Sequence, residues 1–579
     1  MAYPVRMRCL ARIVTVLLVV LAGGCGTAPV PPADNAANPE WAKSLHRFED
    51  GYFALNPSFA VQQGRHEYDG RLPDWSAAGI RAMVQWLHTR RAEAEAFDQN
   101  TLSSDQHFER QYLLSRIDAD LFWLEEAEEP FTNPAFYLGG LDPSVYLTRP
   151  YAPAETRLKA FVSYVRAVPA AAVQIRENLR TPLPKSFIQY GVDGFGGFPD
   201  FYRNDVPKIF AEVKDQALQA ELASTIEPAA RAMQDLADWL DSGRPQATEN
   251  FALGPAKFAA MLRRTERVTT PLAELTKVGR DDLARNEAAL KQACAEYLPV
   301  ATIEACIAKV QADKPSGGAV EGARAQLGML RQFVVDQDLV SIPGTEEALV
   351  AESPPYQRSN SAYIDIPGPY DKGMPSIYYI TPPDPSWSAA EQEAYLPGKS
   401  SLLFTSAHEV WPGHFLQYLH ANRVQSGIGR LFVGYAYSEG WAHYTEELMW
   451  EAGLGNGTPE THIGQLGEAL LRNVRFLCAI GMHTQGMSME SCETMFREQA
   501  YQDPGTARQQ AARGTYDPAY INYTMGKLMI RKLRADWTAN RGGRAAWRAF
   551  HDSFLSYGGP PIPLVREQML GTAEGNLFP

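Results

Sequence analysis

The 579-residue sequence contains no Cys-x-x-Cys pair, no excess of positive charge and no uninterrupted apolar run of 18 residues. The missing cysteine pair argues against a zinc site built from cysteines. A net charge of −13 without clustered basic residues argues against nucleic acid as a partner. Because a permanent membrane-spanning helix needs about 20 apolar residues, we expect the body of the chain to fold in water.

The first 25 residues predict the signal peptide of a bacterial lipoprotein. A basic segment precedes the apolar stretch Ile13–Leu21, which is too short to remain as a membrane span. Residues 21–25 read Leu-Ala-Gly-Gly-Cys and resemble a lipobox, so we expect Cys25 to carry the lipid that binds the membrane. The alternative is an ordinary secretory signal with an incidental cysteine. Gly26 is not the Asp of inner-membrane retention signals, so by resemblance we expect the outer membrane, facing the periplasm.

The remaining sequence divides into a tether and one large domain. Residues 26–40 are rich in proline and lack an apolar pattern, which predicts a disordered tether. Residues 41–579 are long enough for several domains. They contain no second Pro/Gly/Ser-rich linker, charge run or repeat, so we predict a single domain.

Four cysteines lie in this domain: Cys294, Cys306, Cys478 and Cys492. Three pairings are possible, and proximity in an oxidising envelope favours Cys294 with Cys306 and Cys478 with Cys492. The alternative is four small buried thiols.

Apolar residues recur at helical spacing through most of the domain, which predicts a mostly α-helical bundle with a deep cleft. Good helix-forming residues dominate these segments, and proline and glycine separate them. The expected helical segments are Trp75–Phe97, His107–Glu128, Ala154–Leu179, Val206–Leu240, Pro271–Tyr297, Val320–Leu339, Leu402–Arg423, Tyr435–Ala452, Ile463–Ser488, Ala519–Ala539 and Arg544–Tyr557.

Two regions depart from the helical pattern. Residues 190–198 combine glycine with aromatic residues and predict an aromatic loop beside a cleft, or equally a plain surface turn. Tyr363–Ile366 and Ser376–Ile380 read as two strands of a β-hairpin. Since the hairpin comes just before the histidine motif described next, we expect it beside that site, where an edge strand could hold an extended peptide.

Residues 408–414 read His-Glu-Val-Trp-Pro-Gly-His and resemble the zinc-peptidase signature His-Glu-x-x-His, with two extra residues before the second histidine. On an unbroken helix, His408 and His414 would point about 240° apart and could not share an ion. Pro412 removes a helical hydrogen bond and Gly413 permits unusual backbone angles, so a bulged or broken turn could reunite the histidines. The alternative is that the helix simply ends there and leaves His414 unrelated.

A three-residue zinc site needs one further ligand, and Glu439 on the next predicted helix supplies it. The neighbouring Gly440 and Trp441 indicate that Glu439 is buried, and a buried acid needs a partner. His443 lies one turn later and is either a rival ligand or a support for the ligands, and Glu446 is a second supporting residue.

These motifs together resemble the bacterial family called domain of unknown function 885 (DUF885), which is itself similar to helical zinc metallopeptidases of the carboxypeptidase Taq and oligopeptidase kind. The resemblance rests on the 408–414 motif, the Leu416-Gln417 pair after it, Glu-Gly-Trp-Ala-x-Tyr-x-Glu at 439–446, and Tyr-Thr-Met-Gly-Lys at 523–527 with Leu-Arg at 533–534. It implies a helical, cleft-shaped fold that binds one zinc ion.

The resemblance also implies roles for individual residues. The family's common His-His pair after glycine is His414-Phe415 here, which favours His414 as a ligand with His408 and Glu439. The same resemblance casts Glu409 as the general base that takes a proton from the attacking water.

Two further roles are carried over with alternatives. Tyr523 is the first candidate, and Tyr520 the second, to donate to the developing oxyanion, although both fit equally as core aromatics. Lys527, Arg531 and Arg534 are candidates to bind a substrate carboxylate, with surface charge as the alternative for at least two.

The leading hypothesis is therefore a zinc metallopeptidase that cuts peptides. The alternatives are a zinc hydrolase acting on another amide or an ester, and a non-catalytic peptide-binding lipoprotein with a structural zinc. Glu409 favours an enzyme, because a structural zinc site has no use for a base. The sequence makes no prediction of oligomeric state.

Overall fold

The computed structural model describes residues 37–354, 357–358, 361–572 and 575–579. The predicted signal peptide, the proposed lipid site Cys25 and most of the predicted tether lie outside these residues. Helix α1 begins at Pro39, where the Asn38 side chain accepts hydrogen bonds from two amides of the first turn. The last two residues of the predicted tether therefore belong to a capped helix.

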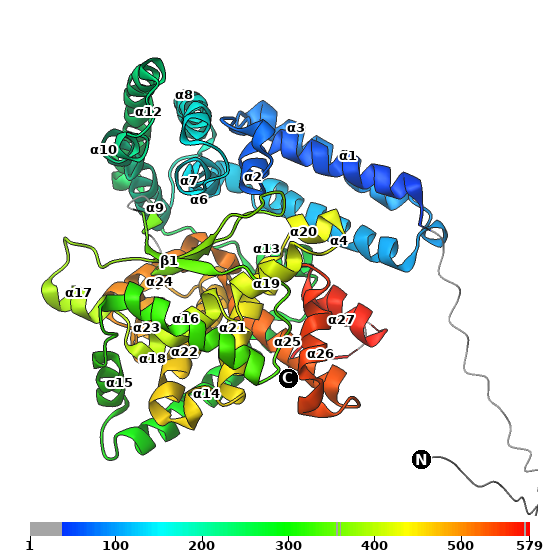
Figure 1. Cartoon of the computed structure of the whole chain (residues 1–579), viewed down its shortest axis with the longest axis vertical. Coiled ribbons are helices and arrows are strands. Elements are labelled where there is room, and N and C mark those ends of the chain that lie inside the picture. The colour runs from blue at the N-terminus through cyan, green and yellow to red at the C-terminus, as the bar shows by residue number, and fades with distance from the viewer. Residues whose placement is uncertain (1–36, 355–356, 359–360, 573–574) are drawn as a thin grey trace, which may run out of the picture.

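The N-terminal helices enclose an aromatic core that includes Trp41, Phe48 and Tyr52. They are α1 (Pro39–Leu55), α2 (Pro57–Gln62), α3 (Ala77–Ala96) and α4 (Ser104–Leu121). A second core lies among the next helices, which stand above the sheet in Figure 1. These are α5 (Glu129–Thr132), α6 (Ala135–Leu138), α7 (Ser144–Thr148), α8 (Ala154–Asn178), α9 (Lys185–Gly196), α10 (Phe198–Asn204), α11 (Val206–Ile209) and α12 (Gln216–Ser242).

The largest core lies within the C-terminal helices and against the sheet. The helices are α13 (Pro255–Glu266), α14 (Leu272–Tyr297), α15 (Ile303–Ala312), α16 (Gly318–Asp336), α17 (Ala389–Tyr395), α18 (Lys399–Glu409), α19 (His414–Ala421), α20 (Gly427–Leu431), α21 (Tyr435–Glu451), α22 (Pro459–Thr484), α23 (Met489–Glu498), α24 (Pro504–Tyr516), α25 (Asn522–Thr538), α26 (Trp547–Leu555) and α27 (Ile562–Leu570). The predicted fold class, mostly helical with a small sheet, is confirmed.

The predicted aromatic loop at residues 190–198 is wrong, because α9 and α10 occupy this region. A Cβ at Gly191 would lie 2.6 Å from Leu240, and one at Gly194 would lie 2.5 Å from Leu138. Here the glycines allow helices to pack closely. Phe195 and Phe198 are buried in the second core, whereas Tyr190 stacks on Tyr516 of α24. The predicted helix Val206–Leu240 is also divided, into α11 and α12.

The predicted hairpin is confirmed and is part of a three-stranded sheet. Strand β3 (Ser376–Ile380) pairs antiparallel with β2 (Ala362–Asp365) and parallel with β1 (Ala348–Glu352). Strand β1 was not predicted, because its Ala-Leu-Val-Ala-Glu sequence lacks the β-branched alternation of a strand. Within the described residues, β2 has a strand partner on one side only, so it is the edge strand that the sequence led us to expect.

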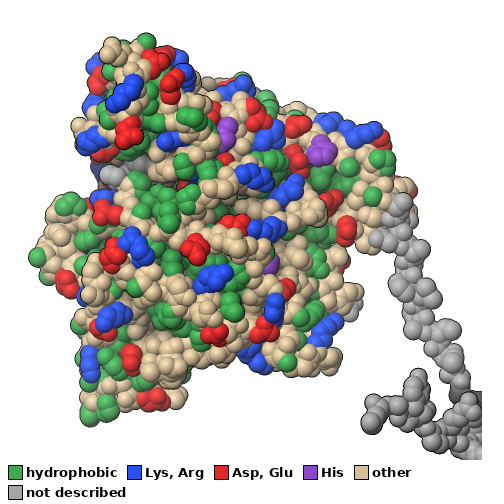
Figure 2. Space-filling model, viewed as in Figure 1, with side chains coloured by type: hydrophobic (Ala, Val, Ile, Leu, Met, Phe, Trp, Pro, Cys, Tyr) green, Lys and Arg blue, Asp and Glu red, His purple; other side chains and the backbone are tan. Residues whose placement is uncertain are grey.

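Both predicted disulfides are present. Cys294 bonds to Cys306, which links α14 to α15, and Cys478 bonds to Cys492, which links α22 to α23. No described helix combines the length and apolarity needed to cross a membrane. Figure 2 shows acidic and basic side chains mixed over the face in view, without a basic patch.

Candidate metal centre

The two histidines of the 408–414 motif lie on different helices that meet at a tight turn. Helix α18 ends at Glu409 and α19 begins at His414. The amide of Gly413 donates to the carbonyl of Ala407 (2.9 Å), which folds the turn back on the end of α18. The rings of His408 and His414 are consequently 4.8 Å apart. The broken turn occurs as one reading predicted, and the alternative that leaves His414 unrelated to His408 is wrong.

Gly413 has a structural reason to stand in this turn, and the backbone of Pro412 joins the turn to α21. A Cβ at Gly413 would lie 1.7 Å from the carbonyl oxygen of His408, so no larger residue fits without moving the backbone. The carbonyl of Pro412 accepts a hydrogen bond (2.9 Å) from the indole of Trp441 on α21. Since Glu439 also lies on α21, this bond ties the histidine turn to the third predicted ligand.

The three predicted ligands converge. Glu439 Oε2 lies 3.3 Å from His408 Nε2 and 3.2 Å from His414 Nε2, and donor atoms of all three residues lie within 4.8 Å of one another. Zinc bonds of about 2.0–2.1 Å in a tetrahedron place neighbouring ligand atoms about 3.3 Å apart. Glu439 Oε2 is buried and accepts no hydrogen bond of good geometry. A shared cation would satisfy it, so the donor set fits one zinc ion.

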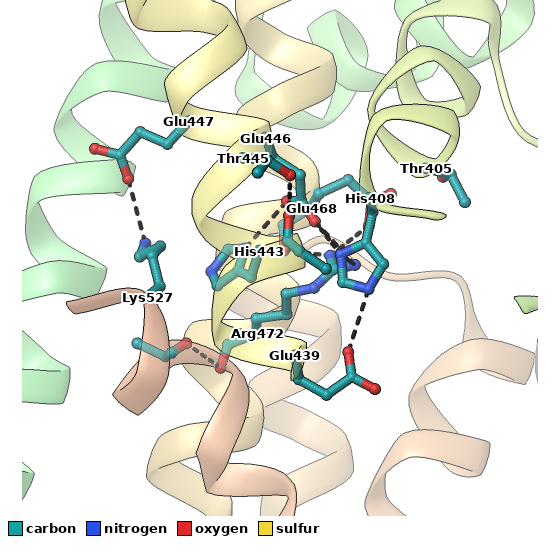
Figure 3. A network of polar contacts seen from close by, with 12 residues as sticks. Thr405, His408, Glu439, His443, Thr445, Glu446, Glu447, Glu468, Arg472 and Lys527 are labelled. Atoms are coloured by element: carbon teal, nitrogen blue, oxygen red, sulfur yellow. Dashed lines mark hydrogen bonds and ion pairs between the residues drawn. The ribbon is translucent and has the colours of Figure 1, made fainter. Parts of the chain in front are cut away.

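Residues behind the ligands orient the imidazoles. Figure 3 shows Glu446 beside His408, and Glu446 Oε1 lies 2.7 Å from His408 Nδ1. The hydroxyl of Ser438 lies 3.1 Å from His414 Nδ1. These contacts leave both Nε2 atoms facing Glu439, as metal-bound histidines require. Arg472 on α22 lies 3.2 Å from the same Glu446 oxygen and 2.6 Å from Glu468. Glu446 was predicted in this supporting role, whereas Ser438 and Arg472 were not.

The charges in this cluster depend on one another. Burial opposes ionisation of Glu446, but the positive charge of Arg472 and the hydrogen bonds with His408 and His443 hold the pKa of its carboxyl well below the usual range. Burial also opposes ionisation of Glu439, yet the two ligand histidines hold its pKa well below the usual range. Both carboxylates are therefore charged at neutral pH. Glu439 can bind a cation, and Glu446 can accept a hydrogen bond from His408.

His443 supports Glu446 and is not a rival ligand. Its Nδ1 lies 3.1 Å from Glu446 Oε2, and the residue is fully buried behind the ligand cluster. Burial, with Lys527 nearby, lowers the pKa of His443 to about 3, so the ring is neutral at physiological pH. His420, a further histidine of α19, donates to the carbonyl of Ser341 (2.8 Å) away from the site.

Glu409 and Tyr523 face the same cleft as the ligands. The cleft has a volume of about 1640 Å³ and is bounded by β2, β3, α18, α22 and α24. Glu409 Oε2 is buried and has no hydrogen-bond partner within the described part of the chain, and burial raises the pKa of the carboxyl. The ring of Tyr523 lies 6.4 Å from that of His408, centre to centre.

Tyr523 reaches the ligands because α25 and α21 touch backbone to backbone. A Cβ at Gly440 would lie 2.5 Å from Gly526 Cα, and one at Gly526 would lie 2.0 Å from the carbonyl of Ala436. This contact brings the start of α25, with Tyr523, beside Glu439. The sequence motifs contain both glycines, but their contact could not be predicted from the sequence.

The roles predicted for four residues do not agree with their positions in the structure. Tyr520 is fully buried away from the cleft, with its hydroxyl 3.9 Å from Cys492 Sγ. The predicted carboxylate binders are internal ion-pair partners of α14 and α21, because α25 runs into the protein after Tyr523. The pairs are Lys527 with Asp282 (2.9 Å), Arg531 with Glu447 (3.3 Å) and Arg534 with Glu451 (2.7 Å). None of Lys527, Arg531 and Arg534 is among the residues that line the cleft.

Arginines of α22 and α24 line the cleft instead. Arg472 and Arg475 lie in a mostly apolar stretch of α22, and Arg513 lies near the end of α24. A charge inside an apolar helix needs a partner, so this pattern was the signal that could have identified Arg472 and Arg475.

Comparison with known proteins gives a family and a fold. A family model described as "Bacterial protein of unknown function (DUF885)" matches residues 57–569. A candidate lipoprotein of unknown function from Shewanella oneidensis is 23% identical, with a TM-score of 0.75 over 92% of this chain and 100% of that chain. A candidate lipoprotein from Colwellia psychrerythraea is 16% identical, with a TM-score of 0.79 over 92% of this chain and 98% of that chain.

Two further comparisons add nothing about activity. A carboxypeptidase from Pyrococcus furiosus is 12% identical over 73% of this chain and 96% of that chain, and its TM-score of 0.24 is too low to bear on fold or function. Among curated proteins no match was found. With the family model matching most of its length, the chain belongs to the DUF885 family of bacterial proteins of unknown function.

Proposed function

We propose that the protein is a zinc-dependent peptide hydrolase. The observation that carries the proposal is the position of Glu409. Its carboxylate is buried beside a His-His-Glu cluster and has an oxygen without a hydrogen-bond partner, although burying such a group is costly. A binding or structural site would gain nothing from this arrangement, whereas hydrolysis needs a base there.

Each remaining residue has a role in this chemistry. When bound by His408, His414 and Glu439, zinc supplies an acidified water and polarises a carbonyl. Glu409 accepts the proton of the attacking water and passes it to the leaving amine. The Tyr523 hydroxyl donates a hydrogen bond to the oxygen that becomes negative. Strand β2, which among the described residues has a strand partner on one side only, lines the cleft and suits an extended peptide held by backbone hydrogen bonds.

Replacing a ligand tests the metal site. We expect purified protein to contain one zinc per chain, and His414→Ala to weaken zinc binding by about 100-fold or more, since even removal of residues behind the ligands costs 10- to 100-fold. Elemental analysis and competition with a chelator measure this. His420→Ala is the matched control, because it removes a histidine of the same helix that contacts the carbonyl of Ser341. Equal zinc in His414→Ala and wild type would refute the site.

We also propose that a lipid on Cys25 anchors the protein to the outer membrane, facing the periplasm. The lipobox-like sequence supports this, as do the two similar structures from candidate lipoproteins. We expect cells to incorporate labelled fatty acid into the wild-type chain and not into Cys25→Ser. Label in the variant would place the lipid elsewhere.

A further inference from the structure

Arg475 is a buried arginine of the cleft without an acidic partner. Its side chain lies on α22 and the residue is 7% exposed. Among the described residues, no carboxylate lies within ion-pair distance of it, and its one hydrogen bond runs from Nε to Gln510 Oε1 (2.8 Å). The other arginines of this wall are paired, buried Arg472 with Glu446 and Glu468, and partly exposed Arg513 with Asp517.

An unpaired buried charge destabilises a protein unless something else compensates for it. Burial lowers the pKa of Arg475, and the nearby positive charges of Arg513 and Arg472 lower it further. The aromatic face of Tyr523, 4.6 Å from the guanidinium, stabilises the cation only in part. The wall of the cleft therefore carries positive charge that an anion entering the cleft would neutralise.

The arginine is also within a short peptide's reach of the metal ligands. Its guanidinium lies 4.6 Å from the ring centre of Tyr523, which lies 6.4 Å from that of His408. The guanidinium is thus no farther than about 11 Å from the His408 ring. Consecutive Cα atoms are about 3.8 Å apart, so one or two residues of peptide beyond the scissile bond cover this gap.

From these observations we propose that Arg475 binds the C-terminal carboxylate of the substrate, so that the protein removes one or two residues from the C-terminus of peptides. With Nε held by Gln510, both terminal nitrogens remain to form the paired hydrogen bonds that a guanidinium makes with a carboxylate. Gln510 acts as a positioning residue that fixes this orientation. This substrate class rests on the proposed peptide hydrolysis, but the carboxylate site itself can be tested without turnover.

The test compares one peptide with a free C-terminus and the same peptide with a C-terminal amide. Calorimetry in the zinc-loaded Glu409→Gln protein measures binding of each without cleavage. We expect the free acid to bind about 10- to 100-fold more tightly, the range of a charged hydrogen-bonded pair. Adding Arg475→Gln should remove this preference and leave binding of the amide unchanged. Arg475→Lys keeps the positive charge but cannot form the paired hydrogen bonds of a guanidinium, so it should retain part of the preference.

Arg497→Gln is the matched control, because Arg497 is an exposed arginine that lines the same cleft. It should leave the preference intact, and equal melting temperatures should show that all variants are folded. Equal binding of acid and amide by the Arg475-containing protein, or an equal loss of both in Arg475→Gln, would overturn the inference. If the preference is present but wild-type protein cleaves neither peptide, the carboxylate site stands and the proposed hydrolysis fails.

Discussion

Glu409→Gln is expected to lower peptide hydrolysis about 1000-fold while zinc remains bound. The substitution keeps the size of the side chain and removes its ability to accept a proton, and general-base catalysis typically contributes 10²–10⁴-fold. The three metal ligands are unchanged, so zinc affinity should stay within a few-fold of wild type. Since Glu409 Oε2 has no hydrogen-bond partner among the residues that the structure describes, the neutral amide should also fit without destabilising the fold.

The measurement is kcat/KM on a peptide library, together with zinc content of the same preparations. Glu498→Gln is the matched control, because Glu498 lines the same cleft but is exposed at its surface. It should cleave peptides at close to the wild-type rate. If Glu409→Gln cleaves peptides as fast as wild type, another residue is the base. If zinc is lost together with activity, the Glu409 carboxylate contributes to metal binding and does not act as the general base.

The convergence of the three candidate metal ligands was predictable because they lie close together in the sequence. Two histidines, an adjacent acid and the Pro-Gly pair between them limit the possible geometries, and Glu439 and Glu446 lie on one helix nearby. What the sequence did not provide was the form of the turn. The helix stops at Glu409, and a glycine packed against the carbonyl of His408 brings the second histidine back.

The candidate carboxylate-binding residues were mispredicted because helical periodicity indicates the face on which a residue lies. It does not indicate whether that turn of the helix is buried or lines a cleft. Tyr523 and Lys527 lie one turn apart on α25 and face similarly, yet one reaches the cleft and the other is buried against α14 and α21. Which turn meets solvent depends on the close contact of Gly440 with Gly526, which joins segments far apart in the chain. The same limitation affected residues 190–198, where glycines that read as a loop allow helices to pack closely.

Lys527→Met should destabilise the protein by about 3–5 kcal/mol at neutral pH, the usual cost of removing one partner of a buried ion pair. Lys527 is fully buried, and its ammonium lies 2.9 Å from Asp282 and 3.5 Å from Glu447. Methionine fills the space but leaves both carboxylates with less compensating charge. Urea unfolding at constant temperature measures the free energy. The matched control is Lys532→Met on the same helix, whose partly exposed pair with Asp536 should contribute at most about 1 kcal/mol.

The difference between wild type and Lys527→Met should also depend on pH. Burial opposes ionisation of Glu447, but Lys527 and then Arg531 lower the pKa of its carboxyl to about 2 in the folded protein. The pKa of Asp282 is lowered as well, with Lys527 the main favourable charge. A depressed folded pKa stabilises the protein above the unfolded pKa, near 4, and this contribution is lost as pH falls toward the folded value. We therefore expect the full difference above about pH 5 and a steady decrease below it. A difference that is constant from pH 7 to pH 3 would mean that Lys527 stabilises the fold by packing and not by charge.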